Sequence, residues 1–163
     1  TRVVRRSAAL LDERQEGYGL NFTYQEHAFY KKLSSALLAS FVTLLFGLII
    51  KTPLRKVVRP LLPKPGEGPS EETMNNGFFD SLFTAELDDG SIETYRVHGK
   101  GDPGYRVTSK FVCESAITLV KDSEKLPGGK DYGGVLTPAT GLGDPLIKRL
   151  SENGISFEGP IAK

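Results

Sequence analysis

The sequence predicts an α+β protein in which an antiparallel or mixed sheet packs against helices, plus one long hydrophobic helix that contacts a membrane. Residues 33–50 are eighteen consecutive uncharged residues, LSSALLASFVTLLFGLII. After a Pro/Gly-rich stretch, the apolar spacing changes from helical to two-residue alternation, which is typical of strands. Further apolar helical patterns, interrupted by glycine and proline, follow this change.

The first segment predicts an amphipathic helix, because Val3, Val4, Leu10 and Leu11 precede a charged run over residues 12–16. We expect it to end at Gly17 or Gly19, since glycine supplies a left-handed cap. Residues 21–30 are interpreted as a strand that leads into the hydrophobic helix.

The hydrophobic helix is expected over about residues 31–51, and Pro53 ends it. Eighteen helical residues extend roughly 27 Å, close to the ~30 Å hydrocarbon thickness of a bilayer. A buried core helix is the alternative, and the sequence leaves open whether the helix spans the bilayer or lies in one leaflet. The residues expected to contact lipid are Leu37, Leu38, Phe41, Leu44, Leu45, Phe46, Leu48 and Ile49.

Three regions are predicted: a helical segment over 1–59, a Pro/Gly linker over 60–76 and an α/β C-terminal domain over 77–163. In the last region, Phe78–His98 is expected to form a β-hairpin around the turn at Asp88-Asp89-Gly90. Thr108 or Ser109 should cap a helix that packs on the sheet.

The remaining elements of that region are a short strand over Gly133–Thr137, a helix over Pro145–Glu152 capped by Asp144, and a last strand over Ile155–Glu158. In the preceding helix, the residues predicted to share the sheet-facing side are Phe111, Val112, Ser115, Ala116, Leu119 and Val120.

Composition excludes several functions. The net charge is +1, which argues against nucleic acid as a partner. The single cysteine, Cys113, cannot form an internal disulfide, and no His/Cys cluster has the spacing of a metal site. Gly99–Gly104 matches G-x-G-x-x-G, but Pro103 removes an amide from the required phosphate cradle, so we expect no dinucleotide site there. No catalytic residues are predicted.

The second half of the chain contains a series of short blocks: Gly101-Asp102-Pro103-Gly104-Tyr105, Gly133–Ala139, Leu146–Leu150 and Asn153–Glu158. In their order and spacing, these blocks resemble the C-terminal end of saccharopine dehydrogenase-like oxidoreductases. The resemblance implies a separate Rossmann domain that binds NAD(P), so that this chain is a C-terminal portion without catalysis of its own. It also implies a possible homodimer and an intracellular membrane address: a lipid droplet, a mitochondrion or the endoplasmic reticulum.

The alternative from a different class is a noncatalytic, membrane-anchored accessory subunit of a larger assembly. In both readings the residues expected to contact a ligand lie at the glycine loop: His98, Tyr105 and Thr108. Tyr105 and Thr108 rest on the resemblance as well as on the loop position.

Overall fold

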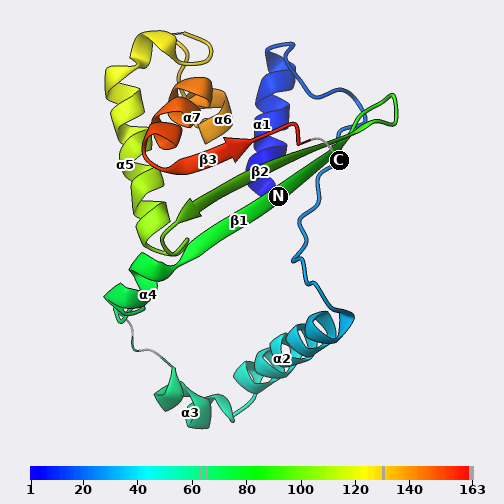
Figure 1. Cartoon of the computed structure of the whole chain (residues 1–163), viewed down its shortest axis with the longest axis vertical. Coiled ribbons are helices and arrows are strands. Elements are labelled where there is room, and N and C mark those ends of the chain that lie inside the picture. Colours follow the sequence, from blue (N-terminus) through cyan, green and yellow to red (C-terminus); the bar gives the residue numbers. More distant parts are fainter. Residues whose placement is uncertain (63, 65, 130, 162–163) are drawn as a thin grey trace. The chain divides into compact units, whose positions relative to one another are not determined.

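The structure is a computed structural model that describes residues 1–62, 64, 66–129 and 131–161. The chain divides into two compact units: unit 1 joins Thr1–Tyr24 with Pro69–Lys163, and unit 2 is Gln25–Gly68 (Figure 1). The elements are α1 (Arg2–Glu13), α2 (Leu33–Lys51), α3 (Arg55–Val58), α4 (Glu71–Asn76), β1 (Phe78–Glu86), β2 (Ile92–Lys100), α5 (Arg106–Lys121), α6 (Pro138–Gly141), α7 (Gly143–Glu152) and β3 (Ile155–Glu158), with 3₁₀ turns at Arg59–Leu61 and Ser123–Lys125.

The predicted α+β class and antiparallel sheet are confirmed. Among the described residues the sheet has the order β1-β2-β3, with both pairings antiparallel. The β1–β2 hairpin turns where it was predicted, and Gly90 adopts a φ of 78° that a side chain would disfavour. The last strand was also predicted with the observed bounds.

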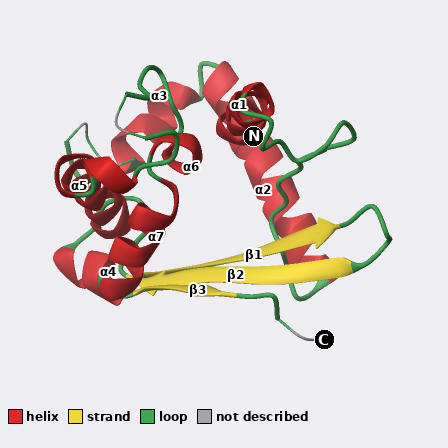
Figure 2. Ribbon diagram, turned by 90° about the horizontal axis from the view of Figure 1, so that it is seen from above, coloured by secondary structure: helices red, strands yellow, loops and turns green. Residues whose placement is uncertain are grey.

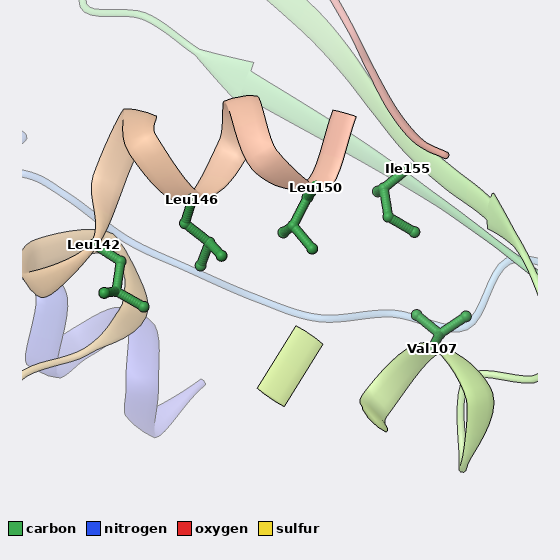
Figure 3. Packing of buried hydrophobic residues seen from close by; sticks show 5 residues of the cluster. All are labelled: Val107, Leu142, Leu146, Leu150 and Ile155. Carbon is green, nitrogen blue, oxygen red and sulfur yellow. The ribbon is translucent and has the colours of Figure 1, made fainter. Parts of the chain in front are cut away.

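Helices α5 and α7 pack on one face of the sheet, as Figure 2 shows. Successive side chains of β2 point alternately to the face that these helices cover and to the opposite face. The core is a small cluster of buried side chains, seen together in Figure 3: Val107, Leu142, Leu146, Leu150 and Ile155. Phe79 of β1 meets Phe111 of α5 edge to face, with ring centroids 6.1 Å apart.

Two sequence predictions for α5 were wrong. The helix begins at Arg106 with Tyr105 as its N-cap residue, and the carboxylate of Asp102, in the preceding turn, accepts hydrogen bonds from the backbone N–H groups of Tyr105 (2.9 Å) and Arg106 (3.2 Å). Thr108 instead lies in the first turn, where its hydroxyl donates to the carbonyl of Pro103. A carboxylate suits this position because the helix N-terminus carries partial positive charge.

The side of α5 that faces the core matches the predicted one at Phe111 and differs from it at other positions. Val107, Phe111 and Thr118 point inward. Val112 and Val120 are 64% and 81% exposed, so the more apolar stripe of this helix faces away from the sheet. Helical periodicity identifies a stripe, but burial is decided by the fit against neighbouring elements.

Three further local predictions were wrong. Residues 133–137 form no strand; they lead to Thr137, whose side chain caps α6 in a capping box with Thr140. Residues 22–30 are irregular as well. Helix α7 starts at Gly143, before Asp144, which lies in its first turn.

Helix α1 belongs to unit 1 although it precedes unit 2 in the sequence. Its Ser7 hydroxyl lies 2.7 Å from the hydroxyl of Thr137, and this contact is buried. Leu10 is buried as well, at 4% exposure. The helix ends at Glu13, and the left-handed residue after it is Gln15 (φ 61°), not Gly17 or Gly19.

In unit 2, the predicted hydrophobic helix is confirmed as α2, Leu33–Lys51. Thr52, the residue before Pro53, is extended, which is the conformation that proline imposes on its predecessor. Within the described chain, α2 is the helix long and apolar enough to cross a membrane, and none of its residues is buried. Length and composition are weak evidence of a membrane by themselves, because a soluble core helix or a signal sequence satisfies them too.

Candidate functional site

The candidate site is an open cleft of about 590 Å³ in unit 1, at the end of the sheet where β1 begins and β2 ends. Its residues come from β1, β2, α5, β3 and the turn before β3. Most of its polar side chains project from the sheet face opposite the core. The lining residues are Phe78, Phe79, Asp80, Arg96, His98, Gly99, Lys100, Lys110, Gly154 and Ser156.

A two-pronged ion pair crosses from β1 to β2 in this cleft. The Nε and Nη2 atoms of Arg96 donate to the two carboxylate oxygens of Asp80 at 2.8 and 2.7 Å. This guanidinium lowers the pKa of Asp80 below its ordinary value, chiefly through the hydrogen bonds. Because two N–H groups on one edge of the guanidinium bond to both carboxylate oxygens, the pair fixes the orientation of the arginine.

A second pair crosses from β2 to β3. His98 Nε2 lies 2.7 Å from a carboxylate oxygen of Glu158, and both side chains are partly exposed. The register places His98 directly between Asp80 and Ser156 on the same face. A histidine held by a carboxylate has a defined ring orientation, so its other ring nitrogen is oriented for a hydrogen bond with a polar ligand.

Two lysines complete the cleft. Lys100 ends β2 and is exposed. Lys110 reaches from α5 to the turn before β3, where its ammonium donates to the carbonyl of Asn153 at 2.6 Å. The lining residues therefore carry more cationic than anionic groups, an arrangement that favours a ligand with negative charge or carbonyl oxygens.

The structure places the three residues predicted from sequence in different surroundings. His98 lines the cleft. Tyr105 is half exposed just before α5, and Thr108 is tied to Pro103 in the first helical turn; neither is a lining residue. No observation tests ligand contact at any of the three, so their role stays a prediction.

The glycine loop does not fit a dinucleotide. Gly99 lies inside a strand that is antiparallel to both neighbours, whereas the phosphate-binding turn belongs to a parallel strand–helix unit. The helix N-terminus behind the loop is already satisfied by Asp102. In the part of the chain that the structure describes, no group of three or more His, Cys, Asp or Glu side chains could hold a metal ion.

Sequence reasoning missed Asp80, Arg96, Lys110 and Glu158. One signal was present: Arg96, His98 and Lys100 alternate with Val97 and Gly99, which predicts a polar face on β2. Their partners could not be found from sequence alone, because the strand register decides which residues stand opposite one another.

Comparison with known proteins identifies relatives by sequence. A protein of Mycobacterium tuberculosis (strain H37Rv), provisionally named as a trans-acting enoyl reductase, is 36% identical over 169 aligned residues. The alignment covers 97% of this chain and 38% of that protein. This chain is similar to trans-acting enoyl reductases. The proteins of that name from Mycobacterium bovis and Mycobacterium ulcerans are each 31% identical, with 95% of this chain and 37% of each relative covered.

These enoyl reductase relatives overturn the predicted resemblance to saccharopine dehydrogenase-like oxidoreductases. The relatives carry a different reductase name, and no known protein-family profile matches the chain. The function that depended on that resemblance, the C-terminal domain of a membrane-associated member of that family, was therefore wrong. No solved structure matches the chain.

The similarity to enoyl reductases supports the coarser prediction of an oxidoreductase, while a lipid droplet or mitochondrial address has no support. The chain spans well under half the length of the relatives it matches.

Proposed function

We propose that this chain forms part of an enoyl reductase that acts in trans, on an unsaturated acyl group presented by another molecule. The observation that carries the proposal is the 36% identity to a relative of that name along 97% of the chain. In such a reaction a hydride adds to the carbon β to the carbonyl and a proton adds to the α carbon, so that the double bond becomes a single bond. The hydride requires a two-electron donor, such as a reduced nicotinamide.

The part played by this chain is to bind and orient the acyl compound, not the hydride donor. Its glycine loop lacks the parallel strand–helix context that a dinucleotide needs. Its cleft instead offers Lys100, the His98–Glu158 pair and the Arg96–Asp80 pair on one rigid sheet. Groups of this kind hold a carbonyl or an anionic group of a substrate through charge-assisted hydrogen bonds.

Exposed apolar surface gives a second line of support. Val112, Leu119 and Val120 form an uncovered apolar stripe along α5, and each is more than half exposed. Contiguous apolar surface of this kind marks an interaction site. We assign it to contact with the part of the enoyl reductase that this chain does not supply, which agrees with the 38% coverage of the relative.

The test is a reductase assay on the intact protein, with an α,β-unsaturated acyl thioester as substrate and oxidation of a reduced nicotinamide as the readout. The unsubstituted protein should reduce the double bond, and product mass should rise by two hydrogens. An intact protein that binds both compounds and reduces no enoyl substrate would refute the proposal.

The cleft is tested separately with Lys100→Gln. Loss of one charge-assisted hydrogen bond should raise KM up to about tenfold while kcat changes little, since the contact holds substrate and transition state alike. Lys148→Gln, which removes an exposed lysine from α7, is the matched control and should leave KM unchanged. An active enzyme in which both variants keep the normal KM would exclude the cleft and leave the reductase function standing.

A further inference from the structure

Unit 2 carries a surface that unit 1 and the proposed reductase function do not use. Between Glu26 and Glu67 the chain has seven cationic residues and no acidic ones. The cations stand on both sides of α2, and no residue of that helix is buried. They are Lys31, Lys32, Lys51, Arg55, Lys56, Arg59 and Lys64.

The segment after α2 has the pattern of a membrane-surface helix. Through α3 and the following 3₁₀ turn, Leu54, Val57 and Leu61 recur at helical spacing and are 57%, 70% and 81% exposed. Arg55, Lys56 and Arg59 occupy the positions between them. A short helix with one apolar side and one basic side binds to anionic lipid headgroups while its apolar side enters the acyl region.

Helix α2 is suited to the hydrocarbon itself. It is apolar on all sides, and its Thr43 hydroxyl is satisfied internally by the carbonyl of Ala39 at 2.8 Å. Polar groups bonded in this way tolerate apolar surroundings. The small or hydroxylated residues Ser40, Thr43 and Gly47 nevertheless share one side, and Leu38 and Leu45 lie on the opposite side.

The fold of unit 1 decides how α2 can enter a membrane. Residues before and after unit 2 belong to one compact body: α1 contacts α6, and the buried Ser7–Thr137 contact joins α1 to the residue that caps α6. Both flanks of α2 therefore lie on the same side of any bilayer. A single crossing would leave them on opposite sides.

The segment after α2 is unsuited to cross the bilayer a second time in the return direction. Residues 51–68 contain five cations and several prolines, and after the end of α2 the described residues among them form only α3 and a 3₁₀ turn. Irregular backbone and unpaired charges do not occur against lipid in the hydrocarbon region. A helix about 10–12 Å wide does fit within one leaflet, whose hydrocarbon is about 15 Å deep.

We propose that unit 2 attaches the protein to an anionic lipid surface, with α2 embedded in one leaflet without crossing and the basic segment 55–59 at the headgroups. The proposal is independent of the reductase function, and it also answers a question that the sequence alone left open. Cations at both ends of α2 place both ends at headgroup level, as an in-plane helix requires.

Binding is tested by flotation of the intact protein with vesicles of phosphatidylcholine, with and without phosphatidylglycerol. Partition should be stronger with the anionic lipid and should fall with salt. Arg55→Gln/Lys56→Gln/Arg59→Gln should weaken it at least about tenfold. Arg2→Gln/Arg5→Gln/Arg6→Gln removes as many exposed charges from α1 and should bind normally.

Insertion is tested with Leu38→Asp/Leu45→Asp, which should reduce partition by about 100-fold or more. The matched control, Val112→Asp/Val120→Asp, makes the same change at exposed apolar residues of α5 and should bind as the unsubstituted protein does. Normal binding by the α2 variant would overturn the proposal. The proposal would also be overturned by two results together: the unsubstituted protein does not float with vesicles, and it forms a dimer without lipid that the Leu38→Asp/Leu45→Asp substitutions dissociate.

Topology is tested with Gln25→Cys and Glu67→Cys together in a cysteine-free background that includes Cys113→Ser. After reconstitution into sealed vesicles, a membrane-impermeant maleimide is added outside, and labels are counted by intact mass. One-leaflet insertion predicts molecules with both labels or with neither, since the two positions share a side. A population with a single label per molecule would show that α2 spans the bilayer and would overturn the proposal.

Discussion

The contact between Gly99 of β2 and its neighbours predicts how the core tolerates added volume. A Cβ atom on Gly99 would lie 2.8 Å from Ile155 Cδ1 and 2.8 Å from Phe79 Cε1. Carbon atoms prefer separations of about 3.5–4.0 Å, so both contacts would be overlaps. Ile155 is 1% exposed, so its Cδ1 can move only toward other buried side chains of the core.

Gly99→Ala should therefore destabilise the fold. Overpacking costs about 1–3 kcal/mol, and removal of a flexible glycine from a strand offsets about 0.5–1 kcal/mol of that. The net expectation is a loss of about 0–2.5 kcal/mol in the free energy of unfolding, centred near about 1 kcal/mol, from the difference of these two ranges. Urea denaturation followed by circular dichroism measures it.

A double-mutant cycle identifies the clashing atom. Ile155→Val removes Cδ1 and should cost about 0.5–1.5 kcal/mol alone. The double variant should lose less free energy of unfolding than the two single variants lose together, by at least about 0.5 kcal/mol, because the deleted methyl group makes room for the new one. Gly133→Ala is the control, because no atom lies within 4 Å of a Cβ atom placed on Gly133. The free energy of unfolding of this variant should stay within about 0.5 kcal/mol of the parent value. Strict additivity of the two core substitutions would refute the steric reasoning.

Two other predictions concern attachments within unit 1. Ser7→Ala removes the buried hydroxyl contact with Thr137 and should cost about 1 kcal/mol, and hydrogen exchange should show the loss of protection concentrated in α1. Arg149→Gln removes the guanidinium whose hydrogen bond lowers the pKa of Asp122 from its ordinary 3.8. A carboxyl with a depressed folded-state pKa stabilises the fold above its unfolded pKa, and the effect disappears as the pH falls through the folded value. The variant should therefore unfold at lower urea concentration than the parent at neutral pH, and this difference should shrink below about pH 4; a constant difference down to pH 2 would contradict it.

Local sequence signals identified those elements whose structure depends on local chemistry. The Asp88-Asp89-Gly90 turn located the hairpin because glycine adopts the positive φ that the turn needs. Pro53 marked the end of α2 because it forces its predecessor into an extended conformation. Neither feature depends on distant parts of the chain.

Features that depend on distant contacts were not predictable in the same way. The burial of Val107 and the exposure of Val112 depend on where α7 and β3 pack, and those elements lie far along the sequence. The contribution of the Asp102 carboxylate was missed because Thr108 also has a favoured capping side chain. In the cleft, the residue types on β2 showed a polar face, but the pairs with Asp80 and Glu158 required the strand register.

The longest of these distant contacts also has the largest consequence for function. Ser7 and Thr137 are 130 positions apart, and their contact makes unit 2 an insertion within a closed fold instead of a segment between two separate domains. An insertion must leave and re-enter its parent body, so both of its ends are held to the same side of any surface that it binds. A hydrophobic helix inserted in this way can dip into a membrane but cannot cross it alone. Hydropathy measures only how apolar the helix is, whereas the proposed entry into one leaflet depends on the packing of α1 against the α6 region, which includes the buried Ser7–Thr137 pair.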